Sequence, residues 1–498
     1  MKHYIAALDQ GTTSSRAILF DKEGNQVASH SCEFRQIFPQ PGWVEHDPEE
    51  IWESQLRALN ETLKQSAVDS RQIRALGITN QRETTVIWDR TSGEPVHNAI
   101  VWQSRQSESI CEDIRQRGWS ELFTERTGLV VDPYFSATKI KWILDHVQGA
   151  RERASQGQLA FGTIDSWLIY KLTEGKIHAT DYSNASRTLL FNIHDLKWDE
   201  ELLARLEIPI SLMPRELPSS EVFGHTSSRF TDGEIPIAGV AGDQQAALFG
   251  QACFRPGEIK NTYGTGCFAL MNTGASPIRS KHGLLTTIAW SVDGQVDYAL
   301  EGSVFIAGAA IQWLRDQLGL VETAAETEAL ARSVPSTEGV FLIPAFTGLG
   351  APYWDSEVRG MLIGLTRGSG RAHLVRAALE SIAYQTVDVV HCFEEDSGHR
   401  VPRLQVDGGA CANDFLMQFQ ADLLGTPVRR PKVIETTALG AAFLAGLAVG
   451  FWESREQISR LWQEDCVFLP KMEENDRHQR QERWRSAIQL ARQWRVSS

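Results

Sequence analysis

The 498-residue sequence has few cysteines, and none is spaced as a metal site or a disulfide framework requires. The seven cysteines are odd in number and include no C-x-x-C pair, which argues against a zinc ribbon or a disulfide-stapled secreted domain. Free thiols of this kind are typical of a reducing compartment. Cys267 and Cys411 lie inside glycine-containing turns, where we interpret them as small buried fillers.

Long apolar runs and an excess of positive charge are also missing. The longest uncharged stretch, residues 436–452, is shorter than the ~20 predominantly apolar residues that a membrane-spanning helix needs. Its many alanines and glycines predict instead a buried helix packed closely on another backbone. The first apolar run stops at Asp9, so we expect no secretory signal and a cytoplasmic location. A net charge of −14 argues against a nucleic-acid surface.

A Walker phosphate loop is absent too, since G-x-x-x-x-G-K-[ST] occurs nowhere in the sequence. Residues 5–20 offer another phosphate-binding arrangement: an apolar strand, a Gly-Thr-Thr-Ser-Ser turn and a second apolar strand. Backbone N–H groups and small hydroxyls in such a hairpin can surround a phosphate chain. Asp9 can hold a hydrated divalent cation at the end of the first strand, and Arg16 can neutralise charge nearby. For this turn alone, a Ser/Thr-rich surface hairpin is an equal alternative.

Two later segments strengthen the phosphate-binding interpretation. Residues 261–271 repeat the design of strand, Thr/Gly turn and strand, and residues 404–413 form an apolar strand that enters a Gly-Gly turn and opens a helix. Glycines and helix N-termini let a backbone approach a nucleotide closely. Three segments in this order are what the actin–hexokinase–Hsp70 type of ATPase uses for two phosphate hairpins and an adenosine loop. We therefore predict an α/β, two-lobed, ribonuclease H-like fold with an interdomain cleft.

The length of the chain exceeds that of a usual single-core domain. Strand-like and amphipathic segments alternate up to Gly250, and the alternation begins again near Ile259 without a Pro/Ser-rich linker. We expect two domains, residues 1–250 and 251–498, packed along a cleft. Asp47-Pro48-Glu49-Glu50 is typical of a helix start, with Asp47 as the cap and Pro48 as the first helical residue.

Over nearly its whole length the sequence resembles the FGGY family of carbohydrate kinases. Residues 134–143 and 360–380 are similar to the family's two signatures, and residues 41–48, 80–84 and 241–245 to its glycerol-specific branch. The resemblance implies ATP-dependent phosphorylation of glycerol to sn-glycerol 3-phosphate, in glycerol uptake and catabolism, with Mg²⁺ as cofactor. It assigns the polyol site, the first phosphate hairpin and the base to the N-terminal domain, and the second hairpin and the adenosine loop to the C-terminal domain. It also implies a homo-oligomer, a dimer or tetramer.

The resemblance makes Asp243 the catalytic general base, which accepts the proton of the attacking hydroxyl. From the local pattern alone, a helix cap is the alternative. For Arg82 and Glu83 the alternative is a loop ion pair, and for the aromatic residues it is ordinary core packing. The implied glycerol contacts, in which charged and amide groups pair with hydroxyls beside an aromatic wall, are Arg82, Glu83, Trp102, Tyr134, Asp243, Gln244 and Phe268. The implied nucleotide contacts are Thr12, Thr13, Ser14, Arg16, Thr265, Gly308, Gln312, Gly409 and Asn413, with Asp9 as the Mg²⁺ ligand.

Two other functions remain open from the sequence. One is an FGGY kinase for another small polyol or a ketose, against which the Arg82–Glu83 pair and the aromatic wall argue. The other is a non-catalytic nucleotide-binding regulator, against which the presence of Asp9 and Asp243 argues.

Regulation is a separate expectation from the resemblance. Some bacterial members of the family respond to fructose 1,6-bisphosphate, or to phosphorylation of a histidine, in the region that matches residues 224–233. This region lacks the glycine run, carries Asp232, and has Arg229 at the position matching the histidine. We predict neither form of control.

Overall fold

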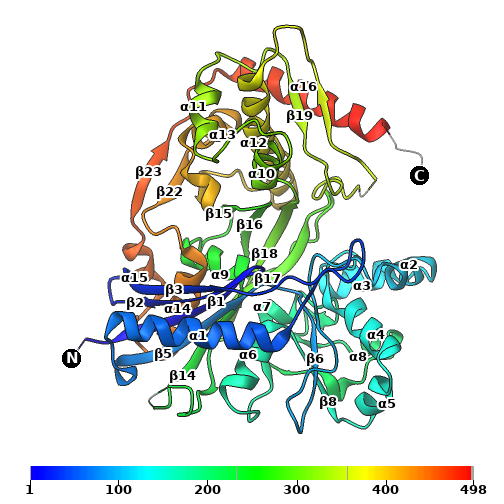
Figure 1. Cartoon of the computed structure of the whole chain (residues 1–498), viewed down its shortest axis with the longest axis vertical. Helices are drawn as coiled ribbons and strands as arrows, with labels where there is room; N and C mark the ends of the chain where they lie inside the picture. Colours follow the sequence, from blue (N-terminus) through cyan, green and yellow to red (C-terminus); the bar gives the residue numbers. More distant parts are fainter. Residues whose placement is uncertain (1, 232, 356, 495–498) are drawn as a thin grey trace.

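The computed structural model describes residues 2–231, 233–355 and 357–494, and two large β-sheets dominate it (Figure 1). The first sheet, in the lower part of Figure 1, has the strand order β13 (Ser220–His225), β14 (Pro236–Gly242), β5 (Ile73–Asn80), β1 (Tyr4–Gln10), β2 (Ser14–Phe20) and β3 (Gln26–Glu33). The second sheet has the order β17 (Leu285–Val292), β18 (Gln295–Val304), β16 (Cys267–Gly274), β15 (Ile259–Tyr263), β21 (Leu404–Asp407), β22 (Val428–Pro431) and β23 (Glu464–Phe468).

The two sheets are built on the same plan. In each, a central strand (β1 or β15) pairs antiparallel with the strand that follows it and parallel with a later strand (β5 or β21). A further parallel strand, β14 or β22, lies beyond, and an antiparallel strand closes that edge. This repeated α/β plan confirms the predicted two-lobed fold, and it explains why the hairpins at residues 5–20 and 259–274 look alike in sequence.

Helices and short strand pairs surround these sheets. The helices of the first half are α1 (Pro48–Ser66), α2 (Glu108–Gln116), α3 (Ser120–Thr127), α4 (Ser136–His146), α5 (Ala150–Ser155), α6 (Ile164–Leu172), α7 (Tyr182–Ala185), α8 (Glu200–Arg205) and α9 (Asp243–Gly250). Those of the second half are α10 (Gly308–Asp316), α11 (Glu326–Arg332), α12 (Arg371–Ser397), α13 (Asp414–Leu424), α14 (Thr436–Ala448), α15 (Arg455–Leu461) and α16 (Glu474–Gln493).

The short elements complete the described chain. The strand pairs are β4 (Glu45–His46) with β7 (Ala99–Ile100), β6 (Val86–Asp89) with β8 (Leu159–Gly162), β9 (Ala179–Asp181) with β12 (Arg215–Leu217), β10 (Phe191–Asn192) with β11 (Lys197–Trp198), and β19 (Phe341–Ile343) with β20 (Met361–Ile363). The 3₁₀ turns are η1 (Ser70–Gln72), η2 (Ile210–Leu212) and η3 (Gly409–Ala412). The predicted start of α1 is confirmed, because the Asp47 carboxylate accepts the N–H of Glu49 and Pro48 is the first helical residue.

Helix α14 belongs to the second half of the sequence but packs on the first sheet, against β1, β5 and β14 (Figure 1). It also crosses α9 backbone to backbone: a Cβ at Gly440 would overlap the Ala246 carbonyl, and one at Gly250 would overlap the carbonyl of Thr436. The alanines and glycines of this stretch therefore serve close packing, as predicted. Among the described residues, no helix combines the length and apolar character that crossing a bilayer requires.

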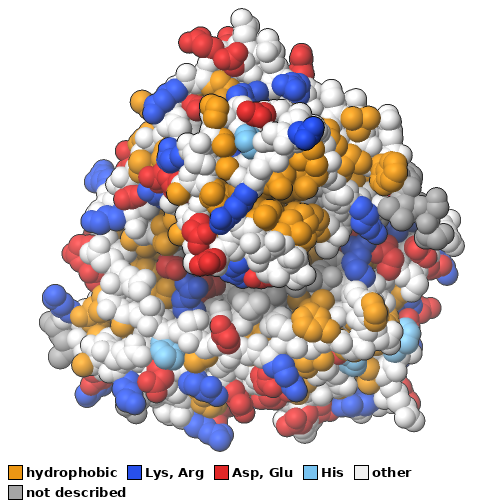
Figure 2. All heavy atoms as spheres, turned by 45° about the horizontal axis from the view of Figure 1, so that its top comes forward, with side chains coloured by type: hydrophobic (Ala, Val, Ile, Leu, Met, Phe, Trp, Pro, Cys, Tyr) orange, Lys and Arg blue, Asp and Glu red, His pale blue; other side chains and the backbone are white. Residues whose placement is uncertain are grey.

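All seven cysteines are free, and Cys267 and Cys411 are buried, as predicted for small fillers. On the face shown in Figure 2, acidic and basic side chains are interspersed rather than gathered into one basic surface.

We expect Gly440→Ala to destabilise the protein, because the added methyl meets the carbonyl of Ala246 and the two helices must separate. Overpacking of this kind costs about 1–3 kcal/mol. Urea unfolding measures the effect. The control is Gly368→Ala at an exposed site, where a Cβ meets its nearest neighbour at an ordinary 3.7 Å. Equal unfolding midpoints for the two variants would contradict the proposed close contact.

Candidate functional site

Three acidic residues, Asp9, Glu435 and Asp243, lie close together near the turn of the first hairpin. Asp9 on β1 lies opposite Arg16 on β2, and the Arg16 guanidinium is paired with Glu435, the residue before α14. Burial raises the pKa of Asp9 to about 6; Arg16 lowers it, while Glu435 and Asp243 raise it further. The structure thus brings together predicted Asp9, Arg16 and Asp243, with Glu435 as an addition that the sequence did not indicate.

The turn of the second hairpin supports the start of α10. The N–H of Gly308 donates to the Gly264 carbonyl at 3.0 Å, and the N–H of Ala307 donates to the Thr265 carbonyl at 2.9 Å. A Cβ at Gly308 would lie 2.6 Å from the Gly264 oxygen, so the close approach requires glycine there. Gln312 lies one turn further along α10 and is exposed. Thr265 and Gly308 therefore lie close together, with Gln312 on the same helix as Gly308; their contact with a nucleotide stays a prediction.

The third predicted loop passes from β21 through η3 into α13. Gly409 begins η3, and a Cβ there would meet no atom within 4 Å, so its surroundings are open. Asn413 caps α13, because its Oδ1 accepts the N–H of Leu416 at 3.0 Å and its Nδ2 donates to Thr327 at 3.2 Å. Asn413 thus has a structural role, which adds to the nucleotide contact that stays a prediction.

Arg82, Asp243 and Tyr134 meet at the other end of the site. The Arg82 Nε lies 3.1 Å from the Asp243 Oδ1, and its Nη2 donates to the Tyr134 hydroxyl at 3.3 Å. Asp243 is the first residue of α9 rather than its cap, which is Gly242, and its carboxylate accepts the N–H of Gln244 at 2.7 Å. The Asp243 side chain keeps 32% of its surface exposed, so a small molecule can reach the carboxylate.

Three aromatic rings stand beside this group. The Trp102 ring lies 5.6 Å from that of Tyr134 and 6.2 Å from that of Phe268, each nearly perpendicular to it. The Trp102 indole N–H donates to Thr12 Oγ1 at 3.0 Å, which connects these rings to the first phosphate hairpin. All three side chains are half-buried, and Tyr134 also packs against the core of the first half of the chain.

Sequence reasoning missed the buried partners of Arg82. The Glu301 carboxylate on β18 accepts from Nη1 of Arg82 at 2.5 Å, from its Nη2 at 3.1 Å, and from Nη2 of Arg187 at 2.9 Å. Glu83 makes a long ion pair with its neighbour, with its Oε1 3.8 Å from the Arg82 Nε, and accepts a much shorter bond from the Arg187 Nε at 2.7 Å. One signal was available, since Glu301 interrupts an apolar strand.

The pKa values of the buried carboxyl groups of Glu83 and Glu301 shift in opposite directions. Burial raises the pKa of Glu83, and the guanidinium groups of Arg82 and Arg187 offset this only in part. At Glu301 burial also raises the pKa, but Arg187 and Arg82 outweigh it and lower the pKa to about 2. Glu301 is thus a permanent anion that two arginines share.

Lys260 on β15 is a further residue that the sequence did not indicate. Its buried ammonium donates to Gln244 Oε1 at 2.5 Å, to Thr262 Oγ1 at 2.8 Å and to the Phe268 carbonyl at 3.2 Å. Burial lowers the pKa of Lys260 to about 8, against the opposing effects of Asp407 and Asp243. Lys260 therefore joins the start of α9 to the second phosphate hairpin.

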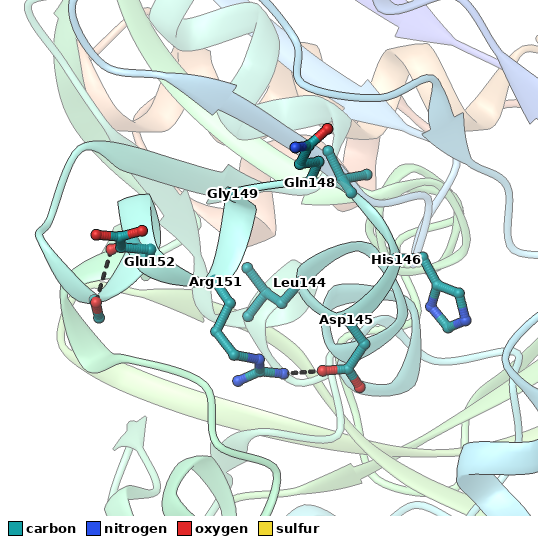
Figure 3. A pocket seen from close by; sticks show the side chains of 9 residues that line it. Leu144, Asp145, His146, Gln148, Gly149, Arg151 and Glu152 are labelled. Carbon is teal, nitrogen blue, oxygen red and sulfur yellow. Dashed lines mark hydrogen bonds and ion pairs between the residues drawn. The ribbon is translucent and has the colours of Figure 1, made fainter.

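Other regions of the described chain are less suited to binding a metal or a ligand. No cluster of three or more His, Cys, Asp or Glu side chains suited to a metal occurs within residues 2–231, 233–355 and 357–494. A surface hollow at the α4–α5 turn is lined by residues 144–149, 151, 152 and 155, where Asp145 and Arg151 pair with each other (Figure 3). In residues 224–233, where we predict no control, the Arg229 Nη1 lies 3.6 Å from the Glu174 Oε1, and Asp232 lies outside the described residues.

Comparisons with known proteins give the family and the fold. The N-terminal domain model of the FGGY family of carbohydrate kinases matches residues 4–250, and the C-terminal domain model matches residues 259–449. The chain is 62% identical to a glycerol kinase of Symbiobacterium thermophilum and 60% identical to glycerol kinase 2 of Thermotoga maritima, each over 99% of both chains. The crystal structure of Plasmodium falciparum glycerol kinase with ADP superposes with a TM-score of 0.92 at 37% identity, over 98% of each chain.

The titration of Lys260 should appear in the stability of the protein. Between pH 8 and 10.5 the unfolded lysine keeps its proton while the folded one has lost it, so the free energy of unfolding rises with pH in this window. From pH 8 to 10.5, the free energy of unfolding of the wild type should rise by about 3 kcal/mol relative to that of Lys260→Met. Urea unfolding at several pH values measures this difference. The control is Lys281→Met at an exposed site. Parallel pH curves for wild type and Lys260→Met would disprove the shift.

Proposed function

The chain belongs to the FGGY family of carbohydrate kinases, and we propose that its site transfers the γ-phosphoryl group of ATP to glycerol, giving sn-glycerol 3-phosphate. The observation that carries this function is the pairing of Asp243 with Arg82 at 3.1 Å, between two phosphate hairpins and an aromatic wall. The identity of 60% or more to glycerol kinases over nearly the whole chain supports glycerol over other acceptors. The likeness to xylulose kinases, at 19–25% identity, shows the fold alone.

Asp243 acts as the general base on the attacking hydroxyl. Its carboxylate is exposed enough to meet a substrate, and the N–H of Gln244 and the Arg82 Nε hold one of its oxygens in place. The second oxygen can then accept the proton while the hydroxyl oxygen attacks phosphorus. The starting position of Asp243 in α9 and its role as a base are compatible.

Glycerol is held by hydroxyl pairing and an aromatic wall. Arg82 and Tyr134 donate, Glu83 accepts, and Gln244 offers its amide, oriented by Lys260. Trp102 and Phe268 stand against the carbon chain and limit its length. Closing of the two lobes would keep water from accepting the phosphoryl group in place of glycerol.

The nucleotide phosphates lie between the two hairpins, with Thr12, Thr13, Ser14, Arg16 and Thr265 as donors. Gly308, Gln312, Gly409 and Asn413 border the rest of the nucleotide. Asp9 would hold a hydrated Mg²⁺: burial raises its pKa most and Arg16 lowers it, while the nearby carboxylates of Glu435 and Asp243, which also raise it, would favour a cation there. A bound Mg²⁺ supplies charge neutralisation for the transferred phosphoryl group.

Three further assignments belong to this proposal. The domain boundary at residue 250 is supported by the ends of the two matched family models. A cytoplasmic location is supported by seven unpaired cysteines. A dimer or tetramer, and the absence of control by fructose 1,6-bisphosphate or phosphohistidine, stay predictions that light scattering and activity assays can measure.

With Mg-ATP, the purified protein should phosphorylate glycerol at a kcat/KM well above that for erythritol, xylulose or ribulose. The aromatic wall limits chain length, and the polar groups match three hydroxyls. ADP release in a coupled assay with this panel gives the comparison. A higher kcat/KM for a pentulose would replace the assignment by another kinase of the family.

Asp243→Asn should lower kcat by about 10²–10⁴-fold, because the amide keeps the shape but cannot accept a proton. Glycerol affinity should change far less, since the contact with Arg82 can be kept. Steady-state kinetics and calorimetric binding of glycerol separate the two effects. Near-normal turnover would mean that Asp243 only helps to begin α9.

A further inference from the structure

Arg82, Glu83, Arg187 and Glu301 form a closed group of two arginines and two glutamates, here called the four-residue cluster. Arg82 and Arg187 both donate to Glu301, and Arg187 also donates to Glu83. Each side chain exposes 2% of its surface or less. The cluster therefore combines two basic and two acidic groups that are almost fully buried.

Such a cluster is a costly way to stabilise a fold. Charges removed from water lose hydration, and apolar residues of similar volume are often as stable or more so. Its geometry points to another use. With Glu301 holding both terminal nitrogens of Arg82, the remaining Nε is aimed at Asp243, at 3.1 Å.

Arg187 extends the same arrangement to the other substrate contacts. Its Nε fixes Glu83, which stands at a left-handed backbone position with φ of 60° that turns the chain after Arg82. Its guanidinium also lies over the Tyr134 ring, 5.7 Å from the centroid. One arginine thus touches Glu83, Glu301 and Tyr134 from behind the face on which glycerol is proposed to bind.

We propose that Glu301 and Arg187 are positioning residues for the acceptor site, which hold Arg82, Glu83 and Tyr134 in the orientation that binds glycerol. The proposal rests on the proposed function. Because Glu301 lies on β18 of the second sheet and Arg82 follows β5 of the first, the same contacts tie the acceptor site to both lobes. Neither residue is placed in contact with glycerol or with the transferred phosphoryl group.

Glu301→Gln tests this directly, since the amide cannot serve as an anionic acceptor for two guanidinium groups. A displacement of about 1 Å at a reacting group can cost 10²-fold. We expect kcat/KM for glycerol to fall about 10²-fold, while KM for ATP stays within about twofold of wild type. The matched control is Glu380→Gln, a buried glutamate on α12 whose carboxylate pairs with Arg376 at 2.7 Å. It should change thermal stability and leave KM for glycerol unaltered.

The double variant Glu301→Gln/Arg187→Gln separates positioning from charge balance, because it removes one charge of each sign. Positioning predicts that its melting temperature recovers toward wild type while kcat/KM for glycerol stays low. If Glu301→Gln does not fold, Glu301→Asp keeps the charge, moves the carboxylate by one methylene and should still lower kcat/KM for glycerol about 10-fold.

Each outcome decides one point. A wild type without glycerol phosphorylation would overturn the proposed function itself. An active wild type with recovered activity in the double variant, or with equal losses for glycerol and ATP, would overturn the positioning role.

Discussion

The contact between α9 and α14 sets the geometry of the whole site. Where Gly440 faces Ala246 and Gly250 faces Thr436, the two helices approach more closely than side chains would allow. Asp243 is the first residue of α9, and Glu435 directly precedes α14. The contact therefore ties Asp243 to Glu435, and through the ion pair of Glu435 with Arg16 to the first hairpin.

Charge compensation is the second constraint on the site. The protein carries a net charge of −14, yet the acceptor end buries the cations Arg82, Arg187 and Lys260. Glu301 and Glu83 compensate the arginines, and the amide of Gln244 accepts from the lysine. A triol with little apolar surface must be recognised through hydrogen bonds, and these are strong only where water is excluded. The compensated charges make a dry, polar pocket possible.

Much of the fold and part of the site could be predicted from the sequence, because the informative patterns were local. The hairpins, the start of α1 and the close-packed α14 are each legible in a short run of residues. Arg82, by contrast, meets Glu301 across 219 positions of sequence, and Glu83 meets Arg187 across 104. Nothing in the neighbourhood of Arg82 or Glu83 indicates those partners, so the sequence paired them with each other. Lys260 was missed for a different reason: Gln244 is only 16 positions away, but their contact depends on how β15 packs against the start of α9.

The ion pair between Arg16 and Glu435 has a consequence for how the enzyme responds to ionic strength. Both side chains are partly exposed, at 31% and 37%, so dissolved salt screens their attraction. A phosphate that took the place of the Glu435 carboxylate on Arg16 would exchange one screened ion pair for another. Added salt weakens the pair that is broken as well as the pair that is formed. With such an exchange, the affinity for nucleotide would be less sensitive to salt than with an unpaired arginine at this position.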